Sequence, residues 1–309
     1  MNNYIKVKAP ATIANLACGF DVLGCAIHEP GDTIEMEMNN SGIITIEQIT
    51  GEPRISMEPE KNVVGAVLSE IKEKHKIPFG FSIKLHKGIA LGSGIGSSAA
   101  SSAAAAVAAN HLLGNIFNQK QLVEFAMAGE FLASGSRHAD NVAPAIMGGI
   151  TIVRSYEPLD IISLEPPDDL YCIVLHPDIK LETKHSRAVL KQDLPLKTAV
   201  KQWGNIAAFV AGILKSDYKI IADSLNDYVA EPYRAILIPG YYQLKQHALN
   251  AGALGAGISG SGPSVFALAK GKNNAYAISA SMSEYYQQTK IKFSVYVSKV
   301  NKQGTIIIS

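Results

Sequence analysis

Residues 88–113 place the strongest constraint on this chain, because a segment rich in glycine and serine leads there into one rich in alanine. Gly92, Gly94 and Gly96 allow tight turns and let backbone N–H groups approach a ligand without a Cβ in the way. Residues 99–109 strongly favour a helix. The pattern predicts a loop entering a helix N-terminus, where unpaired N–H groups and the helix dipole favour an anion such as phosphate.

A linker or a helix-packing surface is a weaker interpretation of this segment. Glycine- and serine-rich runs form both, but a linker would not lead into a long run of helix-forming residues. Residues 81–86 alternate like a strand, and the order of strand, glycine loop and helix suits a phosphate-binding loop. The segment lacks the Gly-Lys-Ser/Thr of a P-loop and the spacing of a dinucleotide-binding fingerprint. Ser97 and Ser98 have three open roles: capping the helix, contacting phosphate or binding Mg2+.

The composition narrows the class of protein. A length of 309 residues suggests two domains, and residues 156–167, with several Pro and Asp, favour a boundary that divides the chain into 1–160 and 161–309. A net charge of +1 without a basic cluster argues against nucleic acid as a partner. Three cysteines without a C-x-x-C pair, no signal peptide pattern and no membrane-spanning run predict a cytoplasmic protein with free thiols and no membrane partner.

The first part of the chain predicts strands. Residues 4–9 alternate apolar and charged side chains like a half-buried strand, which Pro10 is expected to end. Residues 33–38 and 42–49 predict two further strands, joined as a hairpin by the turn at 39–42.

Two predicted helices carry further expectations. Asn62 is expected to cap a helix that runs to about His75. The amphipathic helix predicted over 198–214 carries the only tryptophan, Trp203, which we expect in the core. Strands and helices alternate through the second half, which also holds a second glycine-rich loop at 252–263 and favours an α+β sandwich.

Three stretches place polar side chains in positions suited to a site. In residues 11–24, the simpler interpretation of Asn15 and Asp21 is a turn in which each side chain bonds its own backbone. Glu130, at the end of a predicted helix, is an acid of a kind that usually lies on a solvated helix face. Residues 134–149 hold a polar cluster followed by apolar residues that a surface loop does not need, so we expect the cluster to project into a cleft. Its members are Arg137, His138, Asp140 and Asn141.

Four motifs together resemble a known family. They are Ala9-Pro-Ala-Thr-Ile-Ala-Asn-Leu-Ala-Cys-Gly-Phe-Asp-Val-Leu-Gly, Leu91-Gly-Ser-Gly-Ile-Gly-Ser-Ser-Ala, His138-Ala-Asp-Asn-Val-Ala-Pro-Ala and Gly257-Ile-Ser-Gly-Ser-Gly-Pro-Ser. From end to end the chain resembles the GHMP kinases, and most closely the subfamily whose acceptor is L-homoserine. The departures are small: Ala90 stands where the family often has proline, and Ile13, Ala17 and Cys18 replace Ser, Gly and Pro.

The resemblance implies a fold and an activity. The fold is α+β with two GHMP kinase domains, the N-terminal one similar to a ribosomal-protein domain and the C-terminal one ferredoxin-like, with the substrate in the cleft between them. The activity is transfer of a phosphoryl group from ATP, with Mg2+, to the side-chain hydroxyl of L-homoserine, giving O-phospho-L-homoserine for threonine biosynthesis. The family also implies a homodimer.

The resemblance assigns residues to the nucleotide and the metal. Mg2+ is expected on Ser98 and Glu130, which supply the hard oxygen ligands that it prefers. The nucleotide is expected to contact the phosphate loop and one residue before it. These residues are Asn62, Ala90, Leu91, Gly92, Ser93, Gly94, Ile95, Gly96, Ser97, Ser98, Ala99 and Ala100.

The acceptor carries an ammonium, a carboxylate and a hydroxyl, and each group needs a partner. Asp21 and Asn15 are the candidates for the ammonium, and arginines suit the carboxylate because they donate a fork of hydrogen bonds. The expected acceptor site contains Asn15, Asp21, His138, Thr183, Arg187, Arg234 and Gly260, the last through its backbone.

The residues assigned to catalysis are Asn141, Asp140 and Arg187. Asn141 cannot act as a base, and phosphoryl transfer depends mainly on positioning and charge neutralisation. We therefore favour direct transfer with Asn141 orienting the hydroxyl, and Asp140 as a base is the second choice. Two other functions stay open: a kinase for another small alcohol, such as a mevalonate-type acid, and a non-catalytic nucleotide-binding regulator.

Overall fold

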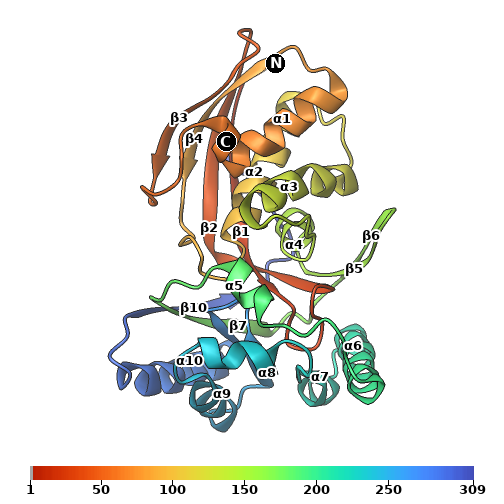
Figure 1. Ribbon diagram of the computed structural model, residues 1–309, viewed down its shortest axis with the longest axis vertical. Coiled ribbons are helices and arrows are strands. Elements are labelled where there is room, and N and C mark those ends of the chain that lie inside the picture. Colours follow the sequence, from red (N-terminus) through yellow and green to blue (C-terminus); the bar gives the residue numbers. More distant parts are fainter. Residues whose placement is uncertain (1–2) are drawn as a thin grey trace.

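The computed structural model describes residues 3–309, which form two β-sheets with helices packed against them (Figure 1). The first sheet contains β1 (Tyr4–Ala14), β2 (Leu23–Asn39), β3 (Ile44–Thr50), β4 (Gly80–His86), β5 (Ile150–Tyr156), β6 (Leu159–Leu164) and β11 (Ile306–Ile307). The second contains β7 (Leu170–Pro177), β8 (Gly255–Ile258), β9 (Val265–Lys270) and β10 (Phe293–Lys299).

The helices divide between the two sheets. Those of the first half are η1 (Pro59–Lys61), α1 (Val63–His75), α2 (Ser97–Leu112), α3 (Gln119–Ser134) and α4 (Val142–Met147). Those of the second half are α5 (Thr183–Ala188), α6 (Leu196–Lys215), α7 (Tyr218–Ser224), α8 (Glu231–Arg234), η2 (Ala235–Leu237), α9 (Tyr241–Asn250) and α10 (Lys272–Gln287). None of the helices within residues 3–309 is both long and apolar enough to cross a bilayer.

The order of the first sheet corrects the predicted hairpin. Its main path runs β11-β1-β2-β4-β3, with β5 paired to β2 and β6 to β5. β2 and β3 are therefore not neighbours, because β4 lies between them and pairs parallel with β3. A parallel pair needs a crossover rather than a tight turn, and α1 supplies it. The turn at 39–42 is real, but it only turns the chain toward the edge of the sheet.

The expectation that Pro10 ends the first strand is also wrong. β1 continues to Ala14, and its register against β2 shifts between Pro10 and Ala11. Proline donates no ladder hydrogen bond but is tolerated at such an irregularity. The longer strand carries the chain directly to Asn15, at the junction between the two sheets.

Helix α2 forms the centre of the first half. It packs against β1 and β2 on one side and against α1 and α3 on the other, so it is buried almost all round (Figure 1). Alanine suits this position because its small side chain lets these neighbours come close. The prediction that Asn62 caps α1 is confirmed, since its Oδ1 accepts a hydrogen bond from the Val64 N–H at 2.9 Å.

The second half has the predicted ferredoxin-like arrangement. Its antiparallel sheet has the order β10-β7-β9-β8, with helical segments between β7 and β8 and α10 between β9 and β10. Helices α9 and α10 cover one face of it, and Tyr241, Ile278 and Tyr286 fill the core between (Figure 1).

Trp203 is not in this core, contrary to our expectation. It lies on α6 with 59% of its surface exposed, and Phe209 and Ile213 form the buried face of that helix. The error arises because α6 carries apolar residues on both faces, so its pattern does not tell which face packs against α7.

The chain passes between the two sheets twice, at neighbouring points. It leaves the first sheet after β6 and enters β7 at Leu170; it returns after β10, where Val300 forms a bridge with Ile27. The Val300 N–H also contacts the Leu170 carbonyl. The predicted boundary at 160/161 falls inside β6, and we propose to place it between β6 and β7, with the chain after β10 returning to the first sheet.

Candidate active site

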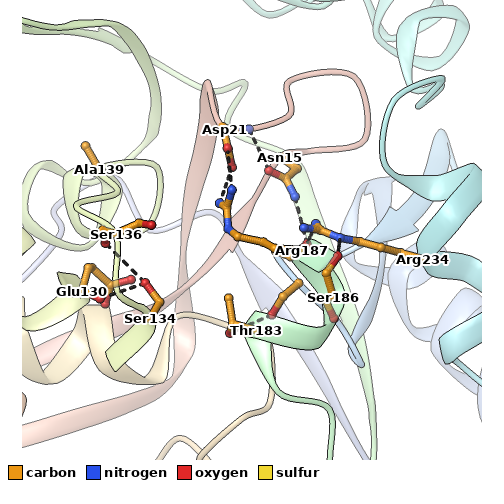
Figure 2. A network of polar contacts seen from close by, with 12 residues as sticks. Asn15, Asp21, Glu130, Ser134, Ser136, Ala139, Thr183, Ser186, Arg187 and Arg234 are labelled. Atoms are coloured by element: carbon orange, nitrogen blue, oxygen red, sulfur yellow. Dashed lines mark hydrogen bonds and ion pairs between the residues drawn. The ribbon is translucent and has the colours of Figure 1, made fainter. Parts of the chain in front are cut away.

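A cavity of about 570 Å3 lies between the two halves. The first half contributes the segment after β1, the phosphate loop, the end of α3 and the start of α4. The second half contributes the segment around α5, the end of α8 and the loop after β8. Figure 2 shows side chains from both halves directed into this space. All acceptor-site residues predicted from the sequence line it: Asn15, Asp21, His138, Thr183, Arg187, Arg234 and Gly260.

The phosphate loop needs glycine for two reasons. Gly92, Gly94 and Gly96 all have positive φ, at +73°, +77° and +70°. Two of them also meet close neighbours: a Cβ on Gly94 would lie 2.4 Å from the Gly262 carbonyl oxygen, and one on Gly96 would lie 2.0 Å from Thr12 Oγ1. The loop is therefore wedged between the two halves of the protein.

Hydrogen bonds fix this loop from both sides. From the first half, the Thr12 N–H donates to the Ile95 carbonyl at 3.1 Å. From the loop after β8, Ser259 Oγ donates to the Gly94 carbonyl at 2.7 Å and Ser264 Oγ to the Ser93 carbonyl at 2.6 Å. The second glycine-rich loop thus holds the first one in place.

The structure separates the roles left open for the two serines. Ser97 Oγ donates to the Ile89 carbonyl at 3.0 Å and so closes the neck of the loop. No side chain of the described residues caps α2 at Gly96, which leaves the N–H groups of its first turn available to an anion. Ser98 instead bonds the carboxyl group of Glu130.

Most of the predicted nucleotide residues line the cavity, and some do not. Those that do are Leu91, Gly92, Ser93, Gly94, Gly96, Ser97 and Ser98. Ala90, Ile95, Ala99, Ala100 and Asn62 are outside the lining. Both ends of the Asn62 amide are occupied, because its Nδ2 also donates to the Ser56 carbonyl at 2.7 Å. These two bonds give Asn62 a structural role, and its contact with the nucleotide stays a prediction.

Glu130 is buried at the end of the cavity nearest to α2. Burial raises the pKa of its carboxyl group to about 7, against a hydrogen bond from Ser98 that lowers it. Its Oε1 is buried without a hydrogen-bond partner. An orphaned carboxylate oxygen beside a serine hydroxyl fits Mg2+, which takes one or two protein oxygens and completes its shell with phosphates and water. Residues 3–309 contain no cluster of three His, Cys, Asp or Glu side chains able to hold a metal by themselves.

An ion pair occupies the other end of the cavity. The two Nη atoms of Arg187 donate to the two oxygens of Asp21 at 2.9 and 3.1 Å (Figure 2). Arg234 is 2% exposed and donates to the carbonyls of Ser186 and Gly260. Burial, followed by repulsion from Arg187, lowers the pKa of Arg234 to about 10, so it remains cationic at neutral pH.

The side chain of Asn15 links two backbone segments at this end of the site. Its Nδ2 donates to the Gly260 carbonyl at 2.9 Å and its Oδ1 accepts from the Asp21 N–H at 3.0 Å. The backbone is strained here, because Asn15, Leu16 and Ala17 all have positive φ, as does Asp21. Such strain costs about 1–3 kcal/mol for each residue and is typical of functional sites. Asn15 therefore shapes the turn that positions Asp21, and it also faces the cavity.

The polar cluster after α3 divides between the cavity and the surface. His138, Asp140 and Asn141 line the cavity, but Arg137 does not. Arg137 lies outside, where its Nη2 donates to both oxygens of Glu70, so the expectation that it enters the cleft is wrong.

The three that face the cavity differ in charge. Burial, with the nearby charges of Asp21 and Glu130, raises the pKa of Asp140 to about 7. Burial and then Arg187 lower the pKa of His138, whose Nε2 is buried without a partner. Asn141 Oδ1 accepts from Thr12 Oγ1 at 2.7 Å, which leaves its amide N–H groups available as donors.

Several lining residues were missed by the sequence analysis. Arg54, Lys180 and Lys184 add positive charge to the wall of the cavity. Arg54 is bound to both oxygens of Glu52, and Lys180 pairs with Glu182 at 3.0 Å. Arg54 and Lys180 come from irregular segments and Lys184 from the short helix α5, and their charges look like ordinary surface charges, so no local pattern identifies them.

Comparison with known proteins agrees with this geometry. Residues 62–149 match the GHMP kinases N terminal domain and residues 209–288 match GHMP kinases C terminal. The homoserine kinase of Chloroherpeton thalassium is 44% identical, over 97% of this chain and 98% of its own. The chain belongs to the GHMP kinase family.

Other members of the GHMP kinase family extend the comparison. The homoserine kinase of Arabidopsis thaliana is 40% identical over 99% of this chain and 85% of its own. The crystal structure of homoserine kinase from Cytophaga hutchinsonii has a TM-score of 0.96 and 47% identity, covering 100% of this chain and 98% of the other. Mevalonate kinase from L. major, with a TM-score of 0.74 and 16% identity over 97% and 98% of the two chains, shares the fold.

Replacing Gly96 by alanine should weaken nucleotide binding because the new Cβ would displace Thr12 and with it Asn141. Gly114, at the other end of α2, is a matched control: its φ is +87° but a Cβ there meets nothing within 4 Å. Both variants should lose about 1 kcal/mol of stability through backbone strain. Calorimetric titration with ADP should detect weaker binding in Gly96→Ala alone. Equal ADP affinities in the two variants would contradict the close packing at Gly96.

Proposed function

We propose that this protein is a homoserine kinase, which transfers the γ-phosphoryl group of ATP to the side-chain hydroxyl of L-homoserine in threonine biosynthesis. The observation that carries the proposal is that a group of charges suited to a zwitterion and a phosphate loop line one cavity. The relatives named homoserine kinase, similar over nearly the whole chain, support the same conclusion.

The charges at the acceptor end suit an amino acid. Asp21 supplies one negative charge, and Arg187 and Arg234 supply two positive ones. A bound carboxylate would balance this excess and accept bidentate hydrogen bonds from an arginine. An ammonium group would then be paired with Asp21. A mevalonate-type acid would supply the carboxylate but leave Asp21 without a new partner, so the charges favour homoserine over that alternative.

The other end of the cavity suits ATP with Mg2+. The N–H groups at the start of α2 would face the phosphates, and Glu130 and Ser98 would hold the ion. Bound there, Mg2+ would supply positive charge that neutralises the phosphate oxygens during transfer. These contacts also make a non-catalytic regulator less suitable, since binding alone requires no acceptor pocket beside the phosphates.

In the transfer, the hydroxyl oxygen of homoserine forms a bond to the γ-phosphorus of ATP. The bond from that phosphorus to the oxygen it shares with the β-phosphate breaks, and ADP leaves with those electrons. In direct transfer without a base, the proton of the hydroxyl passes to an oxygen of the transferred phosphoryl group and from there to solvent. Asn141 lines the cavity beside Gly96 of the phosphate loop, and its free amide N–H groups can orient the hydroxyl. Arg187 would hold the acceptor for this step.

We also propose that the protein is cytoplasmic and forms a homodimer. Sedimentation at several protein concentrations would test the homodimer.

The test of this function is ADP release from ATP and Mg2+ with L-homoserine, L-threonine, mevalonate or galactose as acceptor. We expect release with homoserine. Asp21→Asn should raise the KM for homoserine about tenfold or more, the usual effect of removing a hydrogen bond to a charged group, and leave the KM for ATP unchanged. Release with mevalonate instead, or an unchanged KM for homoserine in the variant, would reject the assignment. A protein that binds ADP but forms no ADP from ATP with any of these acceptors would favour the regulator.

The pKa of Glu130 makes metal binding dependent on pH. At pH values below about 7 its carboxyl group is largely protonated, and it must lose this proton to bind Mg2+. Binding of ADP with Mg2+ should therefore strengthen as pH rises from about 6 to 8 and should release a proton near pH 6.5.

Titration calorimetry in buffers of different ionisation enthalpy measures this proton. The terminal phosphate of ADP also loses a proton when it binds Mg2+, so the difference between proteins is the measure. Glu130→Gln should release fewer protons than the parent, and Asp140→Asn, which removes the other carboxyl group of similar pKa, should release as many as the parent. Equal release by Glu130→Gln and the parent would contradict the assignment of the metal to this residue.

The turnover rate of an Asp140 variant decides whether Asp140 acts as a base. If Asn141 only orients the hydroxyl, Asp140→Asn should keep kcat within about threefold of the parent at pH 8, since no base is removed. A general base contributes about a hundredfold or more, so a loss of that size with an unchanged circular dichroism spectrum would make Asp140 the base.

A further inference from the structure

A buried ion pair lies beneath the phosphate loop, outside the cavity. Asp32 is on β2, and Lys87 directly follows β4 at the start of the loop. Their side chains are 0% and 2% exposed, and Lys87 Nζ contacts Asp32 Oδ2. Neither side chain lines the cavity, so neither can touch the substrates in this conformation.

The pair bonds both ends of the loop at once. Asp32 Oδ1 accepts from the N–H groups of Gly88 and Ile89 at 3.0 and 3.2 Å, which fixes the point where the loop leaves β4. Lys87 Nζ donates to the Ser97 carbonyl at 2.8 Å, in the first turn of α2. The entry and exit of the loop are therefore joined through one carboxylate and one ammonium group.

Ser101 completes this arrangement. Its Oγ donates to Asp32 Oδ2 at 2.7 Å and accepts from Lys87 Nζ at 2.9 Å. Each oxygen of the buried carboxylate thus has two donors. Stability alone is a weak reason for such a pair, because desolvation of two charges offsets much of their attraction. What the pair provides is a fixed geometry at the neck of the loop.

We propose that Lys87 and Asp32 are positioning residues for the nucleotide: they hold the neck of the phosphate loop so that its N–H groups converge on the phosphates. This loop has no lysine of the P-loop kind, and the buried Lys87 acts from behind it through the Ser97 carbonyl. The inference rests on the proposed nucleotide-binding role of the loop. It requires that weakening the pair reduces the affinity for ATP and ADP and leaves the affinity for the acceptor unchanged, because neither Lys87 nor Asp32 bonds an acceptor-site residue.

Two neighbouring serines on α2 give a matched test. Ser101→Ala removes the hydroxyl that bridges the pair, whereas Ser102→Ala removes a buried hydroxyl that has no partner. Both substitutions place alanine in a helix already rich in it, so both should fold. We expect Ser101→Ala to raise the KM for ATP and the Kd for ADP about three- to tenfold, the usual effect of lost hydrogen bonds. Ser102→Ala should change neither, and the KM for homoserine should stay constant in both.

Changes in the pair itself should have a larger effect of the same kind. Lys87→Met leaves an unpaired buried carboxylate and should lower stability; the double variant Lys87→Met, Asp32→Asn removes that charge while keeping an acceptor for Gly88 and Ile89. Its thermal stability should recover relative to Lys87→Met, but its Kd for ADP should stay at least about tenfold raised. A purely structural role predicts that affinity recovers with stability.

The outcomes separate this inference from the proposed function. ADP titration does not depend on the acceptor, so it tests the pair even if the parent protein fails to phosphorylate homoserine. Equal changes in the KM values for ATP and homoserine, or an unchanged Kd for ADP in Ser101→Ala, would overturn the positioning role. A parent protein that does not bind ADP would overturn the nucleotide role of the loop and this inference with it.

Discussion

Hydrogen bonds from two sheets meet on the backbone of one short segment, residues 93–97, and the rest of the site is arranged around it. Thr12 holds the segment from β1, and Ser259 and Ser264 hold it from the loop after β8. The positive φ values of its glycines leave the carbonyls turned toward these donors and the start of α2 open to an anion. Because both halves of the protein bond the same segment, the cavity between them has a defined shape.

The cavity separates charge along its length. Its acceptor end has a net positive charge from Arg187 and Arg234, partly balanced by Asp21. Its other end holds the buried carboxyl group of Glu130, which burial keeps partly protonated near neutral pH. A carboxylate at the first end and a metal ion at the second are each what the local imbalance favours. The arrangement thus gives an amino acid and a metal ion different preferred positions in one cavity.

The residues expected at the site from the sequence lie together, whereas the expected pairing of the strands was partly wrong. Glycine spacing indicated the phosphate loop and local chemistry the cluster at 138–141, while Asp21, Arg187 and Arg234 were expected from the resemblance; all of these line the cavity. The position of β4 between β2 and β3 depends on pairing between distant segments, which local alternation does not reveal.

The same limit explains the errors at single residues. Arg137 and Trp203 turned away from their predicted places because a residue type does not fix the side to which it points. Arg54 was missed because only the folded chain brings it to the cavity. Asn62 was correctly predicted as a cap, because the preference of Asn for this position is local to the start of the helix.

The two passages of the chain between the sheets have a mechanical consequence. They lie side by side, with the Val300 N–H donating to the Leu170 carbonyl, so both covalent connections between the halves lie along one line. Rotation of one half about this line is the relative motion that the covalent chain resists least. Such a rotation would break the hydrogen bonds from Ser259 and Ser264 to the phosphate loop. The contacts that oppose opening of the cavity are therefore the same contacts that support the loop.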